Sequence, residues 1–286
     1  MKTLTFSTVS SASAQVQSWP APFAQLGSWL VVLHRCNPVL SWPAWLHVAL
    51  LVVALLAMPF DDRVITGTNA WIKPAKFAIS GAIYLWTLGW LLADLPAATQ
   101  RAVRRISWGV ATALMVEIAA IYVQAVRGTT SHYNISSPLN ALLFGLMGIF
   151  IMLNTALIIW TLFLVWRHRP HGSVAYVWGV RLGVLLFLVG SAMGGMMIHQ
   201  NAHTVGTPDG GPGLLGLGWS TRAGDLRIAH FLGLHALQLV PLAGWLLGRY
   251  LPRRAVAGTW LFALTYAALT GFIFWEALQG IPLWAR

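Results

Sequence analysis

Four histidines gather in the second half of this chain, at His199, His203, His230 and His235. Imidazole nitrogens bind metal ions and haem iron, and they exchange protons near neutral pH. His199 and His203 are four residues apart, which is the spacing of one helical face. The sequence therefore predicts His199, His203 and His230 as metal ligands, with haem b or a divalent metal as the cofactor. The alternative is that these histidines only form hydrogen bonds with neighbouring residues.

Three further ionisable residues lie inside long apolar runs, namely Glu117, His235 and Lys76. At a rise of about 1.5 Å per residue, Glu117 and His235 each lie roughly 13 Å from the nearer end of their runs, and Lys76 about 7 Å. Ionisable side chains inside a bilayer are costly, and they usually face a bundle interior together with a partner. We predict catalytic roles for all three. A structural hydrogen bond between helices is the alternative for Glu117.

Polar side chains near these residues complete the predicted pocket. Gln124 differs from Glu117 by only about 20° around its helix, and Arg227 and Gln238 share an arc of about 140° with the histidines of their own helix. Together with Arg127, these residues are assigned to binding of the cofactor. Guanidinium groups suit haem propionates, a lipid phosphate or a carboxylate, so the pocket would take a small anionic or lipid-soluble ligand. Snorkelling to the membrane interface is the alternative for Arg227.

The composition places these residues in a membrane protein. The chain has 286 residues, of which 57% are hydrophobic and 9% are charged, whereas soluble domains carry about 25% charged residues. The formal net charge is +11, but the basic residues stand in short loops between apolar runs, so the lipid bilayer is the expected partner and nucleic acid is not. A single cysteine, Cys36, excludes intramolecular disulfides, cysteine-based zinc sites and iron–sulfur clusters.

The elements that must position the pocket are about seven membrane-spanning helices, each near the 20 residues that a bilayer requires. The expected spans are Trp42–Phe60, Trp71–Ala93, Ile106–Val126, Asn140–Trp166, Tyr176–His199, Leu226–Gly248 and Val256–Leu278. The predicted fold is thus an all-α integral membrane bundle over residues 42–286. Residues 1–41 form an N-terminal cytoplasmic or interfacial segment, because Phe23–Leu33 is apolar but too short to span.

The distribution of basic residues predicts the orientation of the bundle. Lysine and arginine are more numerous in the loops on the N-terminal side, which favours a cytoplasmic N-terminus and an outer C-terminus. We therefore expect a multi-pass protein of the bacterial inner membrane, either as a homo-oligomer or within a membrane complex. The histidine-rich pocket then lies in the outer, periplasmic half of the bundle.

Two glycine-rich features refine this arrangement. The stretch Asp209-Gly-Gly-Pro-Gly213 lacks the strand–turn–helix context of a nucleotide-binding loop, and we interpret it as a cap over the outer pocket. Gly190 and Gly194 have the spacing that lets two helices approach closely, which is typical of packing within a bundle. His132 stands in a polar loop between the third and fourth spans, and we leave it without an assigned role.

Four functions are compatible with these residues. The leading hypothesis is a protein that binds haem or a metal for redox chemistry. A membrane-embedded zinc-dependent hydrolase or transferase is the second, because zinc lowers the pKa of bound water to about 7. A solute transporter or receptor is the third, in which the pocket binds a solute without chemistry. An accessory subunit of a membrane complex is the fourth.

Overall fold

The computed structural model describes residues 26–214 and 216–283, and within these residues it contains eight α-helices. Seven of the helices in this described part are long and apolar enough to cross a membrane, which confirms the predicted number of spans and the all-α class. The helices are α2 (Leu26–Cys36), α3 (Pro38–Ala57), α4 (Ile72–Ala93), α5 (Gln100–Val126), α6 (Pro138–Arg167), α7 (Val174–His199), α8 (Leu226–Tyr250) and α9 (Ala255–Leu278). Short 3₁₀ turns occur at Met58–Phe60, Ala97–Thr99 and Pro252–Arg254.

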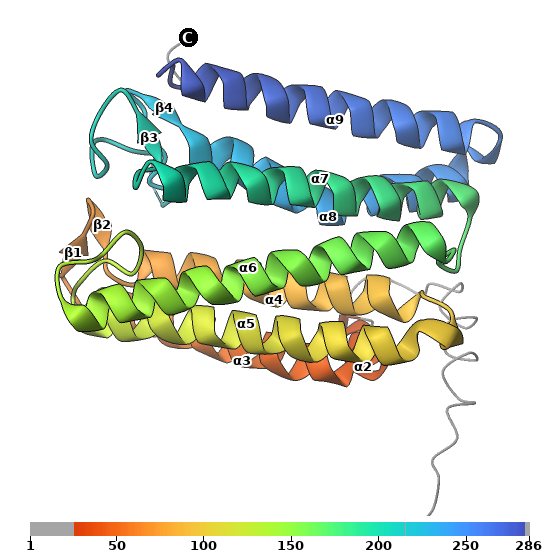
Figure 1. The fold of residues 1–286 in the computed structure, drawn as a ribbon, viewed down its shortest axis with the longest axis horizontal. Helices are drawn as coiled ribbons and strands as arrows, with labels where there is room; N and C mark the ends of the chain where they lie inside the picture. Colours follow the sequence, from red (N-terminus) through yellow and green to blue (C-terminus); the bar gives the residue numbers. More distant parts are fainter. Residues whose placement is uncertain (1–25, 215, 284–286) are drawn as a thin grey trace, which may run out of the picture.

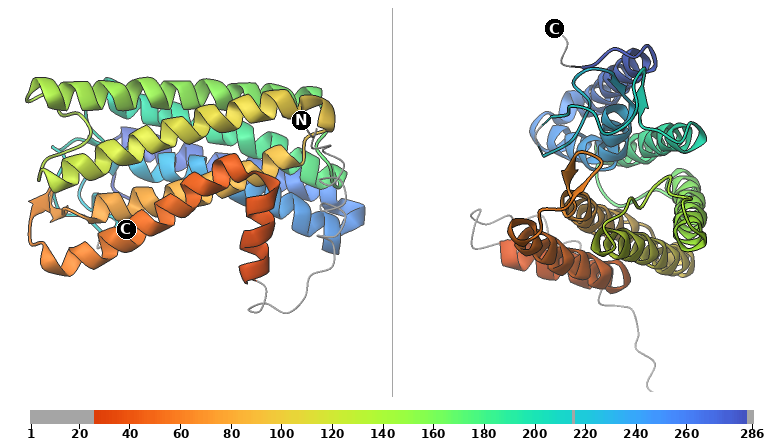
Figure 2. Two further views of the ribbon diagram at one scale, coloured as in Figure 1. Left: turned by 90° about the horizontal axis from the view of Figure 1, so that it is seen from below. Right: turned by 90° about the vertical axis from the view of Figure 1, so that its left-hand side faces the viewer.

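The seven long helices form two groups that lie side by side (Figures 1 and 2). Helices α3 to α6 form one group, and α7, α8 and α9 form the other, with α6 adjoining α7 where the chain passes between them. The main core lies inside the first group and extends to α7, and it includes Leu85, Leu88, Ile106 and Val184. The face that α4 turns toward α8 therefore lies on the boundary between the two groups.

Local sequence signals explain where the helices begin. Asn37 caps α3 by accepting a hydrogen bond from the backbone of Leu40, and Pro38 occupies the first turn. Ser137 caps α6 in the same way. Helix α5 begins at Gln100, before the expected Ile106, because its first turns are polar and fall outside the apolar run while remaining helical.

Helices α7 and α8 touch backbone to backbone. A Cβ atom added to Gly233 would lie 2.4 Å from the Cα of Gly190, and one added to Gly190 would lie 2.6 Å from the carbonyl carbon of Gly233. Only glycine permits this approach. The expectation that Gly190 and Gly194 serve packing inside the bundle is confirmed, since Gly194 lies against the ring of His230.

One end of the bundle, which we call the capped end, carries three connecting segments. They are the hairpin of β1 (Val64–Ile65) and β2 (Thr68–Asn69), the loop 127–137, and the cap loop 200–225 with its strands β3 (Thr204–Val205) and β4 (Gly224–Asp225). Thr66 and Gly67 both have positive φ, as the tight turn of such a hairpin requires. Helices α3, α5, α7 and α9 end at the capped end (Figure 1).

The short helix α2 lies at the opposite end of the bundle and is turned steeply away from α3 (Figure 2). Its 11 residues are too few to cross a bilayer. This geometry suits the predicted interfacial segment 1–41, of which residues 1–25 lie outside the described part of the chain.

Candidate functional site

Glu117 is the most deeply placed acid at the capped end. It lies on α5, and only 7% of its surface is exposed. Its Oε1 atom is 3.7 Å from Nε2 of His132, whereas its Oε2 atom has no hydrogen-bond partner among the described residues. A buried carboxyl group with a spare oxygen is costly unless it binds a proton, water or a ligand. Glu117 therefore has the properties of a site that can exchange a proton.

His132 links this acid to a lysine. The loop 127–137 brings the imidazole into the bundle, where Nδ1 lies 3.1 Å from the Nζ atom of Lys73 and 3.1 Å from the Oγ atom of Ser131. An ammonium group only donates, so Nδ1 accepts and Nε2 carries the hydrogen that faces Glu117. Burial, with the positive charge of Lys73 as a second cause, lowers the pKa of His132 well below its usual value. The imidazole is therefore neutral and bridges Lys73 and Glu117.

Lys73 supplies positive charge that no neighbouring acid neutralises. It stands in the first turn of α4, and among residues 26–214 and 216–283 no carboxylate lies within ion-pair distance of its ammonium group. The ammonium group also lies 5.9 Å from the ring centre of Phe77. Lys76 differs, because its Nζ atom donates to the carbonyl of Leu217 in the cap loop at 2.8 Å. Lys73 is thus available to an anion, while Lys76 holds the cap to α4.

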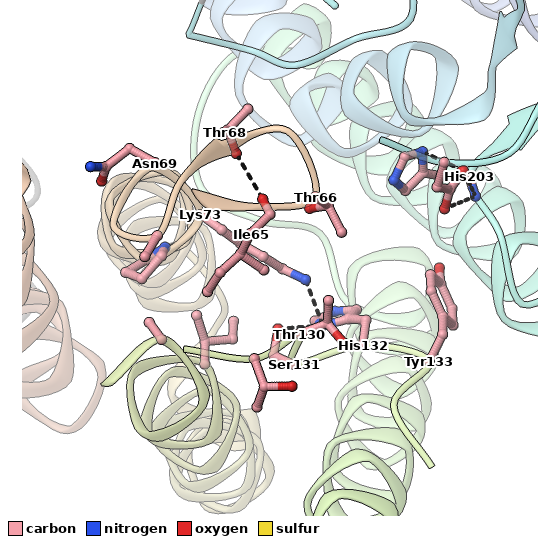
Figure 3. Close-up of a pocket in the computed structure, with 16 residues that line it drawn as sticks. Ile65, Thr66, Thr68, Asn69, Lys73, Thr130, Ser131, His132, Tyr133 and His203 are labelled. Atoms are coloured by element: carbon pink, nitrogen blue, oxygen red, sulfur yellow. Dashed lines mark hydrogen bonds and ion pairs between the residues drawn. The ribbon is translucent and has the colours of Figure 1, made fainter. Parts of the chain in front are cut away.

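Lys73 and His132 line a pocket at the capped end, which Figure 3 shows in close-up, and Glu117 lies behind His132 outside its wall. Its volume, including the part open to solvent, is about 570 Å³. In Figure 3 the side chain of Lys73 points toward His132, and Tyr133 and His203 lie on the facing side. The wall consists of the β1–β2 hairpin, the first turn of α4, the last turns of α5, residues 129–133, His203 and Asp209.

His203 is held by an acid of the cap loop. Its Nδ1 atom lies 3.1 Å from Oδ1 of Asp209, which also accepts hydrogen bonds from the backbone of His203 and Thr204. Burial and, secondly, the charge of Arg227 lower the pKa of His203 to about 4, and Asp209 only partly opposes this effect. His203 is therefore neutral over the physiological range and fixes the shape of the cap loop.

The four residues predicted to bind a cofactor make contacts within the protein. Arg127 donates to the Oδ1 atom of Asn140 at 2.7 Å and also to Gln124, which ties the end of α5 to the start of α6. Arg227 pairs with the buried Asp225 at 2.6 Å and bonds the cap loop. Gln238 donates to the hydroxyl of Thr87 at 3.3 Å, across the boundary between the two helix groups.

The predicted metal ligands occupy separate surroundings. His199 is exposed at the end of α7, and the backbone N–H of His203 donates to Asp209, whose carboxylate also lies 3.1 Å from the imidazole. The Nδ1 atom of His230 lies 2.8 Å from the carbonyl oxygen of Gly190. In the described part of the chain, no group of three or more histidine, cysteine, aspartate or glutamate side chains is arranged to hold a metal ion. The predicted haem or metal site thus stays a prediction.

Lys76 and His235, the two residues predicted to act with Glu117, make their contacts away from its carboxyl group. Lys76 bonds the cap loop, and His235 packs on Phe231 with 4.2 Å between the ring centres. His132 takes their place next to Glu117, although the sequence analysis assigned it no role. The sequence signal that could have identified it is the polar run Thr129–Asn134. In the structure, the neighbouring Tyr133 adopts φ of 57°, a conformation rare for an aromatic residue.

Comparisons with protein-family models, with curated protein sequences and with solved structures find no match to this chain.

Proposed function

We propose that this protein binds a small anion in the capped-end pocket and that Glu117 takes up a proton as the anion binds. The contact chain from Lys73 through His132 to Glu117 carries this proposal. Lys73 offers charge to the anion, Glu117 offers a buried carboxylate to the proton, and the imidazole connects them. The protein would then act as a transporter or receptor for an anionic solute.

The chemistry follows from the hydrogen bonds that the anion would replace. An anion at Lys73 draws the ammonium hydrogens away from Nδ1 of His132, so Nδ1 can accept a proton from water. The hydrogen on Nε2 then passes to Oε1 of Glu117, and the ring becomes neutral again. The 3.7 Å between Nε2 and Oε1 has to shorten to about 3 Å for this transfer. One anion and one proton enter together, so no net charge is added to the low-dielectric interior.

The expected topology supports the same assignment. The predicted orientation places the capped end on the periplasmic side of a bacterial inner membrane. Arg227 and Lys76 donate hydrogen bonds to carbonyl groups of the cap loop, and His203 and Asp209 of this loop form part of the pocket wall. Such a site suits capture of a solute from outside the cell.

Calorimetry on the detergent-purified protein tests the proposal, with inorganic phosphate and succinate as probes. Titrations in two buffers with different heats of ionisation give the number of protons taken up per anion. We expect about one proton for the wild type and almost none for Glu117→Gln. Lys73→Gln should weaken anion binding about tenfold or more, which is the loss of a charge-assisted hydrogen bond.

The matched control is Arg222→Gln, which removes one exposed positive charge from the same end of the bundle. It should leave both anion affinity and proton uptake unchanged. If Arg222→Gln weakens binding as much as Lys73→Gln, general surface charge rather than the pocket attracts the anion. Unaltered proton uptake in Glu117→Gln would disprove the role of the carboxyl.

Binding of haem b or a divalent metal for redox chemistry is a second proposal, and one observation favours it. The Nδ1 atom of His230 bonds the carbonyl of Gly190, an arrangement that orients a metal-binding histidine and leaves Nε2 as the ligand atom. His230 would hold the iron or metal, which would supply electron transfer. An absorption spectrum of the purified protein, oxidised and then reduced, tests this proposal. A Soret band that His230→Ala abolishes is the expected result, and a colourless protein without bound metal would contradict it.

A further inference from the structure

Helix α4 carries polar side chains along one face for most of its length. Lys73, Lys76, Ser80, Tyr84 and Thr87 follow one another at spacings of three or four residues. At about 100° per residue, all five fall within an arc of about 80°. A helix that crosses a bilayer has no need of such a continuous row, because polar side chains are costly at that depth. We call this row the α4 polar stripe.

The stripe faces partners on the other helices. Tyr84 donates its hydroxyl hydrogen to Oδ1 of Asn154 on α6 at 2.9 Å, and its ring stacks on Phe187 of α7. Thr87 accepts the hydrogen bond from Gln238 of α8. These contacts place the stripe on the boundary between the two helix groups, where α4 lies below α7 and α8 in Figure 1.

The boundary also offers polar atoms to water, although apolar side chains such as Leu85, Val184 and Leu237 pack across it. Ser80 is exposed although it lies between Lys76 and Tyr84 on the same face. The Oε1 atom of Gln238 is buried and makes no hydrogen bond of ordinary geometry among the described residues, although the Gln238 side chain interacts with the imidazole of His235. A buried polar atom of this kind usually bonds an ordered water molecule. Successive stripe residues are about 5 to 6 Å apart along the axis, a distance that one bridging water covers.

The stripe leads to an acid at the opposite end of the bundle. Asp94 directly follows α4, and its carboxylate accepts a hydrogen bond from the hydroxyl of Tyr176 on α7. Trp90, one turn before Asp94, also bonds the hydroxyl of Tyr176. Burial raises the pKa of Asp94 to about 6, so this carboxyl group binds and releases a proton close to neutral pH. Trp90 and Tyr176 fill the interval of about 10 Å between Thr87 and Asp94.

We propose that the α4 polar stripe is a proton path that joins the capped-end pocket to Asp94 at the opposite end of the bundle. This inference rests on the proposed proton exchange at Glu117 and extends it across the bilayer. The hydroxyl groups of Ser80, Tyr84, Thr87 and Tyr176, and the waters between them, each accept one hydrogen and donate another, whereas Lys73, Lys76 and Trp90 only donate hydrogen bonds to this path. One proton enters at His132, one leaves at Asp94, and no charge stays in between. The membrane potential or a pH difference supplies the driving force, and no oxidant or reductant is needed.

The competing interpretation is that the stripe only holds helices together, as polar side chains do in many membrane bundles. The two interpretations differ at Thr87. Valine has nearly the same shape as threonine and keeps the packing, but it lacks the hydroxyl group through which a proton would pass. Thr155 is a matched control, because its hydroxyl also bonds the carbonyl four residues earlier and it lies on α6, away from the stripe.

The test is proton flux into liposomes that contain the protein and an internal pH dye, driven by a potassium gradient with valinomycin. Flux is recorded without added anion, with inorganic phosphate and with succinate. We expect flux through the wild type above that of empty liposomes in at least one condition. Thr87→Val and Asp94→Asn should each reduce it about tenfold, and Thr155→Val should leave it unchanged.

Two results would overturn the path. One is wild-type flux no greater than that of empty liposomes in all three conditions, and the other is equal flux through Thr87→Val and Thr155→Val. The calorimetric test separates this failure from failure of the proposed function. Proton uptake upon anion binding without flux would refute the path alone, whereas flux without anion binding would refute the anion site and keep the path.

Discussion

Helix α8 packs against two neighbours in two different ways. Against α7 it presents Gly233, which meets Gly190 so closely that a single methyl group would not fit. Against α4 it presents Gln238, which donates a hydrogen bond to Thr87 and whose Oε1 atom makes no hydrogen bond of ordinary geometry among the described residues. At the first interface the two backbones are in contact, whereas at the second a polar side chain is only partly bonded. The comparison indicates that α7 and α8 form a rigid unit, and it makes the boundary with α4 the place where our proposal puts water and protons.

The largest effect on stability should come from a bulky side chain placed at the glycine contact between α7 and α8. Gly233→Leu forces the α7 and α8 backbones apart, and overpacking on this scale costs about 3 kcal/mol or more of the free energy of unfolding. We expect loss of monodisperse protein after extraction into detergent, measured by size-exclusion chromatography. Gly271→Leu is the control, because nothing lies within 4 Å of a Cβ added there. Equal yields for both variants would show that the glycine contact does not define a rigid unit.

The next largest effect is on proton uptake, and it should distinguish His132 from His235 as the partner of Glu117. His132→Asn removes the bridge between Lys73 and the acid, so proton uptake upon anion binding should fall about tenfold. His235→Asn should change it by less than about twofold, because that ring packs on Phe231. Calorimetry in two buffers measures both variants. If His235→Asn instead reduced proton uptake more than His132→Asn, His235 would be the partner of Glu117, as the sequence alone predicted.

A smaller effect concerns the acid at the opposite end. Burial raises the pKa of Asp94 from 3.8 to about 6, so between these values the folded protein binds a proton that the unfolded chain has released. The free energy of unfolding therefore falls as pH rises through this window. Asp94→Asn lacks this loss and should be more stable than the wild type by about 3 kcal/mol well above pH 6, with the difference vanishing near pH 4. Thermal unfolding across this pH range measures it, and a difference independent of pH would contradict the assignment.

The smallest effect concerns how much the α4 polar stripe contributes to the free energy of unfolding. Tyr84→Phe removes the hydrogen bond to Asn154 and should lower the free energy of unfolding by about 1 kcal/mol. Stacking on Phe187 is retained, so the fold should survive. Thermal unfolding gives the stability. A loss well above 3 kcal/mol would mean that this contact is a main structural bond rather than part of a loosely packed boundary.

The sequence predicted the helices better than it predicted their partners. Hydropathy locates each span because the bilayer imposes length and apolarity on every crossing segment. Depth along a helix also follows from counting residues, and it identified Glu117 as a buried acid. Counting cannot tell which loop enters the bundle, so it could not bring His132 from loop 127–137 to that acid. That placement depends on tertiary contacts, including the bond from Lys73.

The same limit explains the histidines chosen as metal ligands. Spacing of four residues puts His199 and His203 on one face only if the helix continues through both, but α7 ends at His199. His203 therefore belongs to the cap loop, where Asp209 holds it. The α4 polar stripe, in contrast, was visible in the sequence as a regular spacing. Spacing alone does not predict its role, because hydroxyl groups on a spanning helix can equally bond the carbonyl four residues earlier, as Thr87 does.

The order of the cap loop in the chain has a consequence for biogenesis. Lys76 lies on α4, but the carbonyl that it bonds belongs to Leu217, which the ribosome adds 141 residues later. Helix α4 is therefore made long before the acceptor of Lys76, whereas Lys73 finds His132 within the first helix group. A chain arrested before residue 200 would lack the cap-loop contact of Lys76. The part of the pocket wall that His203 and Asp209 form is thus added only after α7 has been made.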